Sequence, residues 1–417
     1  MRLLWLCNLI PGTVQQTIDG SAGNGLWIDH TLEDLLAEPG MTLRVLCRGP
    51  KACQGTGGNL SYRVFEEPVM HRYELSLEAI FRQEVRSFAP DVIHIWGTEY
   101  SHTLAMLRIC QSEGLLDRTI VGIQGLCTIC AKHYAEGLPA SAAHGFSPRD
   151  LLRMDNVAMQ RRHYFQRGEM ERAALSVTRH VLGRTHWDRA CTEMLAPQAE
   201  YHFCGETLRE SFYTGSWQYE ACRKHSIFAS GPDTPIKGFH LLLEAMKLVL
   251  SKYPDATLCV PGPDIFRSRG RARLLEQTYH RYLRRWAAKN GLTEHIRFLG
   301  RLDAEQMKGA FLDANVFVLP SVIENSPNTL GEAMLLGLPC VAADVGGVAS
   351  MLHAPEEGLL YQSSAPYVLA RKICDVFAME ADAAAMGAAA QARARKNHDP
   401  KTNLQTLLTI YRSLSPE

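Results

Sequence analysis

The sequence contains no apolar run near the roughly 18 to 20 residues that a membrane-spanning helix needs, so it does not predict an integral membrane protein. An excess of charge of either sign is also missing, because 44 basic residues balance 44 acidic ones. Domains that bind nucleic acid are usually strongly basic, so a nucleic-acid partner is not expected. What remains is a globular chain of 417 residues, long enough for two domains that each have a core.

The opening residues MRLLWLCNLIPG are interrupted by Pro-Gly too early for a secretion signal, and the sequence predicts a first strand there. The 12 cysteines follow no regular framework, so we expect reduced thiols in a cytosolic protein. Cys127 and Cys130 form one Cys-x2-Cys pair, but no second pair accompanies them to complete a zinc site. No metal site is predicted, because no DxD-type cluster stands in a suitable loop.

Short apolar runs alternate with segments of helical period along the whole chain, which predicts the α/β class with parallel sheets. A segment of little periodicity, 206–224, separates a first domain at 1–205 from a second at 225–398, and a last helix lies within 399–417. Ligands of such sheets bind outside the carboxyl ends of the strands. The loops at these ends are therefore where we expect the functional site.

The stretch 321–347 has the arrangement of a phosphate site. A buried strand over 316–319 precedes a polar loop and a predicted helix over 328–336, for which Ser326 is a suitable N-cap and Pro327 a suitable first residue. The first N–H groups of a helix point outward at the positive end of its dipole, where a phosphate can bind. We expect a phosphate against the N–H groups of the residues at this helix start, Asn328, Thr329 and Leu330.

Two carboxylates accompany this helix start with seven residues between them, Glu324 in the loop and Glu332 about one turn inside the helix. A carboxylate near a bound phosphate is useful if it accepts hydrogen bonds from a neutral diol, so we assign Glu332 to a ribose. Glu324 would meet the hydroxyls of a second group beyond the phosphates. Alternatively, Glu332 is an ordinary first-turn carboxylate and Glu324 a solvated loop residue, since charged side chains mostly lie at surfaces.

The E-x7-E pattern follows a strand that ends in Pro-Ser and is continued by EAMLLGLPCVAADVGGV, and it resembles the donor-site signature of the family 4 retaining glycosyltransferases. The form ENSPNTLGEAM is similar to the branch that builds bacterial capsular and O-antigen polysaccharides. The resemblance implies the GT-B fold, in which two Rossmann-like domains face each other across a cleft and a terminal helix returns to the first domain.

The same resemblance implies a reaction. A sugar passes from a nucleotide diphosphate sugar, most commonly a UDP-sugar, to a glycan or polyprenyl-linked acceptor with retained anomeric configuration. The donor is a substrate, so no cofactor is expected, and no metal is required. The expected location is the cytoplasm, at the inner face of the cell membrane.

Further donor-side residues follow from the resemblance. Lys237 and Gly238 precede an LLLEA helix and resemble the family's phosphate-binding lysine, which makes Lys237 and Glu324 the expected catalytic pair. The loop at Arg301 would hold the nucleobase. The family usually has an arginine several residues before the lysine, where this chain has Gly231-Pro232.

The missing arginine leaves the phosphate site open to two interpretations: Arg301 or Arg184 compensates, or binding rests more on Lys237.

On the acceptor side the family resemblance points to two loops of the first domain and one strand end. The candidates there are Glu99, His102, Gln124, His133 and Arg184. Family members often carry a histidine where this chain has Gln124, so that histidine's role is not carried over.

These departures keep two other functions open. One is a non-catalytic module that binds a nucleotide sugar or a membrane partner. The other is a different GT-B enzyme, such as a nucleotide-sugar epimerase or a phosphorylase, because a fold alone does not fix function.

A predicted helix over 267–289 interleaves arginines with aromatic side chains, which suits an anionic membrane surface. A solvated helix face is an equal alternative. Its basic and aromatic residues are Arg269, Arg271, Arg273, Arg281, Arg284, Arg285, Tyr282 and Trp286.

Overall fold

The computed structural model describes residues 1–21, 27–67, 69–267, 270 and 275–416. Contacts between residues divide the chain into two compact units. Unit 1 comprises Met1–Ala131, His163–Arg209 and His398–Glu417, and unit 2 comprises Lys132–Arg162 and Glu210–Asn397.

The segment Lys132–Arg162, which was predicted to belong to the first domain, clusters with unit 2. The ring nitrogen Nε2 of His240 lies 2.8 Å from the backbone oxygen of Glu136. The buried carboxylate of Asp150 accepts the backbone N–H of Thr278 at 2.9 Å. These contacts join the segment to residues that lie far along the chain, so sequence distance alone could not assign it.

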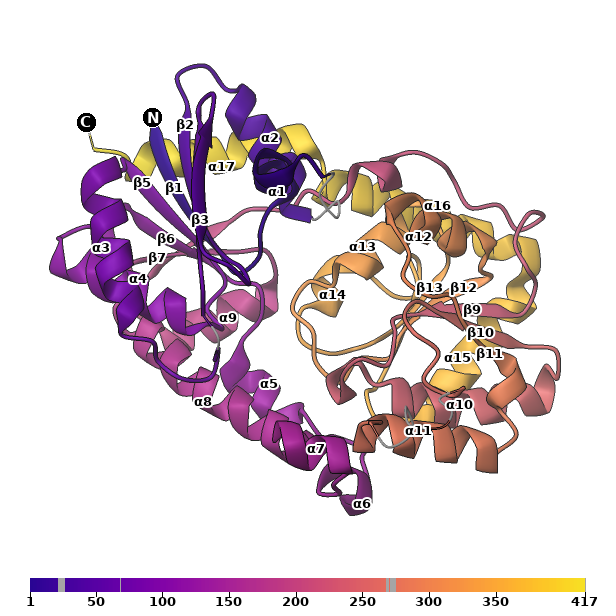
Figure 1. Ribbon diagram of the computed structural model, residues 1–417. Helices are drawn as coiled ribbons and strands as arrows, with labels where there is room; N and C mark the ends of the chain where they lie inside the picture. The colour runs from indigo at the N-terminus through magenta and orange to yellow at the C-terminus, as the bar shows by residue number, and fades with distance from the viewer. Residues whose placement is uncertain (22–26, 68, 268–269, 271–274, 417) are drawn as a thin grey trace. The chain divides into compact units, whose positions relative to one another are not determined.

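In the described part of unit 1, eight strands form a sheet in the order β3-β4-β2-β1-β5-β6-β7-β8 (Figure 1). All neighbours are parallel except β3 and β4, which form an antiparallel hairpin. The order reverses between β1 and β5. The strands are β1 (Arg2–Cys7), β2 (Thr42–Arg48), β3 (Cys53–Gly57), β4 (Leu60–Phe65), β5 (Val92–Trp96), β6 (Thr119–Gly122), β7 (His180–Gly183) and β8 (Glu200–Phe203).

Helices cover both faces of this sheet, which is why β1 is apolar along its length. Leu3, Trp5 and Cys7 of β1 belong to one core cluster, together with side chains of α2 and α17, whereas Leu4 and Leu6 belong to another with α3 and α4. The helices with residues in unit 1 are α1 (Gly12–Asp19), α2 (Trp27–Ala37), α3 (Ser76–Phe88), α4 (Ser101–Ser112), α5 (Cys127–His133), α8 (Val157–Leu175), α9 (His186–Leu195) and α17 (Pro400–Leu414).

The last helix, α17, is part of the core of unit 1. The hydroxyl of Tyr411 accepts the indole N–H of Trp5 at 3.1 Å and lies 2.6 Å from Nδ1 of His94. All three side chains are fully buried. Burial lowers the pKa of His94 to about 3, so its ring is neutral and can accept a hydrogen bond from the Tyr411 hydroxyl.

In the described part of unit 2, six parallel strands form a second sheet in the order β11-β10-β9-β12-β13-β14. The strands are β9 (Ser226–Ala229), β10 (Thr257–Val260), β11 (Ile296–Phe298), β12 (Val316–Leu319), β13 (Cys340–Ala343) and β14 (Leu359–Tyr361). Its helices are α6 (Ala140–Ala143), α7 (Pro148–Arg153), α10 (Phe239–Lys252), α11 (Thr278–Lys289), α12 (Ala304–Asp313), α13 (Asn328–Leu335), α14 (Val348–Met351), α15 (Pro366–Met379) and α16 (Ala383–Asn397).

Both units are thus α/β layers on parallel sheets, which confirms the predicted fold class. Among the described residues, no helix combines the length and the hydrophobicity that crossing a bilayer requires.

Candidate functional site

The predicted donor-side residues follow strands of unit 2 at the point where the strand order reverses. β9 to β11 extend the sheet in one direction and β12 to β14 in the other, so β9 and β12 are neighbours. Such a reversal leaves a crevice between the two loops that follow these strands. Lys237 lies in the 3-10 turn η3 (Pro235–Lys237) after β9, and Glu324 lies in the loop after β12. The sheet topology therefore brings these two residues together.

The side chains of Lys237 and Glu324 form an ion pair at the crevice. The distance from Lys237 Nζ to Glu324 Oε1 is 2.6 Å, and Ser321 Oγ donates to the same oxygen at 2.8 Å. The Lys237 side chain is 40% exposed and that of Glu324 is 12% exposed. An ammonium group held by a carboxylate yet open to solvent can also reach an anionic ligand.

Gly238 has a left-handed backbone conformation at the point where the loops after β9 and β12 meet. Its φ is +67°, and a Cβ there would overlap the backbone oxygen of Pro320. The N–H of Val322 donates to the oxygen of Ile236 at 3.0 Å, so the loops after β9 and β12 are in direct contact. The structure thus gives Gly238 a packing role between two loops, beside the ligand-binding role that the resemblance implied.

The loop after β13 holds the backbone of Glu324 from the other side. Gly347 donates its N–H to the oxygen of Glu324 at 3.1 Å. Gly346 has a φ of +51°, and a Cβ there would overlap the same oxygen. The Glu324 carboxylate therefore projects from a backbone that neighbouring loops fix on both sides.

The observed start of helix α13, the predicted phosphate site, differs from the prediction in two details. The N-cap of α13 is Pro327, and Ser326 was wrong as a cap, because its hydroxyl lies 3.5 Å from the sulfur of Met351. Leu330 was wrong as an open donor, because its N–H is donated to the oxygen of Pro327 at 3.0 Å. Asn328 and Thr329 remain the first two residues of the helix. Their N–H groups stay the predicted phosphate donors.

Glu332 lies inside α13 and is only 2% exposed. A hydroxyl that binds its carboxylate must enter the interior of this edge of unit 2. Such a buried carboxylate can accept more than one hydrogen bond from a neutral diol.

Arg301 follows β11 at the same edge of the sheet and is exposed. Because β10 lies between β11 and β9, Arg301 starts roughly 10 Å from the strand that leads to Lys237. Its backbone neighbour Gly300 pairs with Gly262, at N···O distances of 2.8 and 3.1 Å. The structure therefore places Arg301 beside the crevice, two strands from the Lys237–Glu324 pair.

In unit 1, Glu99 lies where the sheet order reverses between β1 and β5. Asn8 after β1 donates to the Tyr100 hydroxyl after β5 at 2.6 Å. Burial raises the pKa of Glu99 to about 7, while the nearby Arg167 guanidinium opposes the rise. Arg167 also donates to the backbone oxygen of Glu99 at 2.7 Å and stacks over the Tyr100 ring. A carboxyl of this pKa can hold or release a proton near neutral pH.

The sequence alone does not single out Arg167, because several other arginines lie in the same helix, α8. His102, in contrast, was wrong as a residue for contacting substrate. It is fully buried, and its Nδ1 lies 2.7 Å from Glu67 Oε2. Glu67 also accepts the His102 backbone N–H and the Ser101 hydroxyl, so it caps the start of α4. His102 is therefore part of a buried capping arrangement.

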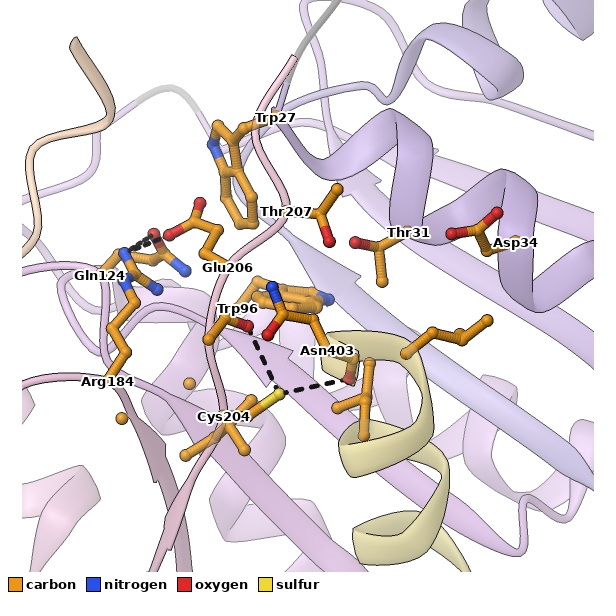
Figure 2. Close-up of a pocket in the computed structure, with 16 residues that line it drawn as sticks. Trp27, Thr31, Asp34, Trp96, Gln124, Arg184, Cys204, Glu206, Thr207 and Asn403 are labelled. Atoms are coloured by element: carbon orange, nitrogen blue, oxygen red, sulfur yellow. Dashed lines mark hydrogen bonds and ion pairs between the residues drawn. The ribbon is translucent and has the colours of Figure 1, made fainter. Parts of the chain in front are cut away.

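Gln124 and Arg184 line a pocket of unit 1 (Figure 2). Arg184 Nη2 lies 2.6 Å from Glu206 Oε2 and donates to Gln124 Oε1 at 3.1 Å. Trp96 at the end of β5 and Trp27 of α2 form apolar parts of the wall. The sequence missed Glu206, which lies in the aperiodic segment. Its carboxylate balances the charge of Arg184, so this group suits neutral hydroxyls better than it suits a phosphate.

His133 is not among the residues that line this pocket, and it clusters with unit 2. Its side chain is 40% exposed, and its Nδ1 lies 2.8 Å from Glu136 Oε2. Of the five acceptor-side candidates, Gln124 and Arg184 contact each other and line the pocket. Glu99, His102 and His133 do not line it, although the Glu99 carboxylate lies close to Gly125, the residue after Gln124.

Comparisons with known proteins match the second half of the chain to a family. Residues 222–393 match the model described as Glycosyl transferases group 1. The phosphatidyl-myo-inositol mannosyltransferase of Mycobacterium leprae is 32% identical over 143 residues, which cover 34% of this chain and 34% of that protein. The chain spans about a third of the length of the curated relatives it matches. These relatives do not specify the capsular or O-antigen branch, which stays a prediction.

Solved structures match almost the whole chain in fold. Sucrose-phosphate synthase from Thermosynechococcus elongatus covers 99% of both chains with a TM-score of 0.70 and 17% identity. Anabaena Alr3699/HepE in complex with UDP-glucose covers 99% of this chain and 100% of its own, with a TM-score of 0.65 and 16% identity. The chain therefore has the GT-B fold, and its residues 222–393 are similar to the glycosyl transferases group 1 model.

Proposed function

We propose that this protein transfers a sugar from a nucleotide diphosphate sugar, a UDP-sugar, to a hydroxyl of a glycan or lipid-linked glycan in the synthesis of a cell-surface polysaccharide. The observation that carries the proposal is the Lys237–Glu324 ion pair at the reversal point of the unit 2 sheet. It lies within the segment that matches the glycosyl transferases group 1 family.

The chemistry needs charge stabilisation on the departing diphosphate. Lys237 and the N–H groups of Asn328 and Thr329 would supply it, without a metal. Glu324 would orient the donor sugar and stabilise positive charge that develops near its ring. Attack on the face from which the phosphate departs retains the anomeric configuration, and the leaving phosphate takes the acceptor proton. A protein base is then not required.

The names of similar proteins support the proposed donor class, a UDP-sugar, and the proposed acceptor class, a lipid-linked hydroxyl. Alr3699/HepE, which shares the fold, was solved with UDP-glucose, and this supports a UDP-sugar donor. The Mycobacterium leprae relative is named as a mannosyltransferase that acts on phosphatidyl-myo-inositol, and this supports a lipid-linked acceptor. The neutral hydrogen-bonding group of Gln124, Arg184 and Glu206 is our proposed contact for acceptor hydroxyls.

The donor site is tested by calorimetric titration with UDP, GDP, ADP and their common sugars, in the absence of metal. One nucleotide should bind, and Glu332→Gln should weaken its binding by roughly 10- to 100-fold. The reason is that hydrogen bonds to a charged group contribute about 1.5–3 kcal/mol. Glutamine keeps the volume of the buried side chain and removes only its charge.

The matched control is Glu305→Gln, which removes a carboxylate that is 68% exposed on α12 of the same unit. It should bind the nucleotide as the unchanged protein does. If no nucleotide binds, the donor site is refuted. Binding without sugar transfer to any acceptor, water included, would favour the non-catalytic module, and a changed sugar on the same nucleotide would favour an epimerase.

We further propose that unit 2 contacts an anionic membrane through a basic face made of Arg281, Arg285 and Lys289, which line one groove with Phe146. Phe146 is 49% exposed, as expected for a side chain that enters a lipid interface. The Asp150–Thr278 hydrogen bond ties the neighbouring helix α7 to the start of α11. The predicted contributions of Arg269, Arg271 and Arg273 lie outside the described residues.

Arg284 does not belong to this face, although the sequence grouped it with the others. Its guanidinium donates twice to the carboxylate of Glu276, at 2.9 and 2.8 Å, and the Glu276 side chain is buried. A guanidinium held in this bidentate pair is not available to lipid phosphates.

The triple variant Arg281→Gln/Arg285→Gln/Lys289→Gln should bind vesicles that contain anionic lipid roughly 100-fold more weakly. Each basic residue near such a surface contributes about 1 kcal/mol. Vesicle sedimentation at fixed ionic strength measures the effect.

The control removes the same charge elsewhere in unit 2, by Lys252→Gln/Arg371→Gln/Lys372→Gln on α10 and α15. Equal vesicle binding by the two triple variants would refute the basic face.

A further inference from the structure

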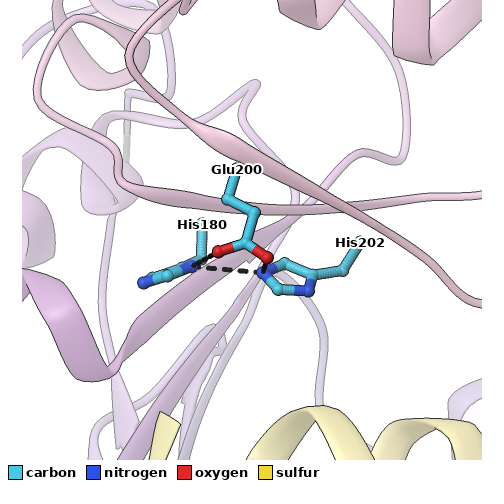
Figure 3. Close-up of side chains that lie close together, drawn as sticks. All are labelled: His180, Glu200 and His202. Carbon is cyan, nitrogen blue, oxygen red and sulfur yellow. Dashed lines mark hydrogen bonds and ion pairs between the residues drawn. The ribbon is translucent and has the colours of Figure 1, made fainter. Parts of the chain in front are cut away.

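Two histidines and a glutamate meet at the outer edge of the unit 1 sheet, away from the residues used above. They are His180 at the start of β7 and Glu200 and His202 on β8 (Figure 3). His180 pairs with Glu200 in the strand register, and Leu182 pairs with His202. Residues two apart on a strand, and residues directly opposite on neighbouring strands, point to the same face of a sheet. All three side chains therefore lie on one face.

The potential ligand atoms are close together. His180 Nδ1 lies 3.1 Å from His202 Nε2, and the carboxylate of Glu200 lies 3.7 Å from the first and 4.0 Å from the second. In a tetrahedral zinc site, bonds of about 2.0–2.1 Å leave ligand atoms roughly 3.3 Å apart. The two imidazoles already have this spacing. The Glu200 side chain is 68% exposed and can move the remaining few tenths of an ångström.

The two imidazoles share a hydrogen bond between His180 Nδ1 and His202 Nε2. An ion that binds between them would replace this hydrogen bond, because both nitrogens must then offer lone pairs. Ligand histidines are commonly oriented by a carbonyl that binds the second ring nitrogen, and the backbone of Asp117 lies beside the His180 ring.

We propose that His180, Glu200 and His202 form a binding site for a divalent transition-metal ion, with zinc as the best match to two imidazoles and one carboxylate. Three protein ligands leave a fourth position for water. The ion would join β7 to the edge strand β8 at their amino ends. The same two strands are joined beyond their carboxyl ends by the Arg184–Glu206 pair. The site would thus hold the edge strand that leads to Glu206.

The test uses the whole protein under reducing conditions, with Co²⁺ as a spectroscopic probe and Zn²⁺ as its competitor. One Co²⁺ per chain should bind with d–d absorption of a nitrogen and oxygen site, and Zn²⁺ should displace it. Glu200→Gln and His202→Ala should each weaken binding by more than the roughly 10- to 100-fold that loss of an outer-shell partner costs. Zn²⁺ should raise the melting temperature of the unchanged protein more than that of Glu200→Gln.

The matched control is His225→Asn, which removes a histidine paired with a carboxylate, Asp255, at 2.8 Å; the described part of the chain offers no third ligand there. It should bind Co²⁺ normally, and asparagine tolerates the positive φ of 55° at this position. Three results overturn the proposal: no Co²⁺ bound, a thiolate charge-transfer band that assigns the ion to cysteine, or triad variants that bind as the unchanged protein does. Glu200 is exposed, so Glu200→Gln keeps the test valid if a histidine variant fails to fold.

Discussion

Lys237→Ala is expected to lower the turnover of sugar transfer by roughly 10²-fold or more, because it removes the ammonium that stabilises the departing diphosphate. The ammonium is on a side chain that is 40% exposed and that Glu324 positions, so an anionic ligand can approach it from solvent. The loss should appear mainly in kcat, since the charge that it stabilises is greatest in the transition state. Steady-state kinetics with the donor found by calorimetry measures it.

Lys308→Ala is the matched control, because Lys308 is also in unit 2 and pairs with a carboxylate, Glu305, at 3.0 Å, but lies on α12. It should leave kcat unchanged. Lys237→Met retains most of the side-chain stem without the charge and should behave like Lys237→Ala. A Lys237→Ala protein with normal kcat would show that the ion pair only shapes the loops.

The second large effect is expected from Gly238→Ala, which should destabilise unit 2 by about 3–5 kcal/mol. The added methyl group would overlap the backbone oxygen of Pro320, and backbone cannot move aside as a flexible side chain can. The loops after β9 and β12 would have to separate, which would also displace Lys237. Thermal melting measures the loss, and hydrogen exchange in β9 and β12 locates it.

Gly291→Ala separates the two causes of this effect. Gly291 has a φ of +72°, close to the +67° of Gly238, but among the described residues, its two chain neighbours aside, nothing lies within 4 Å of its added Cβ. It should therefore lose only the roughly 1–2 kcal/mol that a left-handed conformation costs an L-residue. Equal destabilisation by the two variants would show that the contact with Pro320 contributes nothing.

The sequence could predict the crevice of unit 2 because the crevice is built from short segments that follow successive strands in chain order. Each candidate lies in the loop or at the helix start that follows an apolar strand, or in the first turns of that helix, and the parallel α/β pattern brings strand ends to one edge. The details of the helix start could not be predicted. Whether Ser326 caps α13 depends on Met351, and whether Leu330 is open depends on how tightly the first turn closes on Pro327.

Side-chain burial and strand register explain two further features that the sequence did not predict, the role of His102 and the meeting of His180 with His202. His102 follows a strand end as Glu99 does, and only the buried carboxylate of Glu67, which lies far earlier in the chain, shows that its role is structural. His180 and His202 are far apart in sequence and meet because β7 and β8 pair in one particular register. A register shift of one residue would put them on opposite faces, and no sequence pattern fixed it.

The position of Tyr411 has a consequence for how the protein is made. A ribosome releases the strands of unit 1 early, but the helix that covers Trp5 and His94 is translated only after the whole of Glu210–Asn397. Multidomain chains generally complete their amino-terminal domain first during translation. Here the order is reversed for part of the fold: the apolar face of unit 1 that α17 covers stays open until Pro400–Leu414 has been synthesised, which is after the whole of Glu210–Asn397.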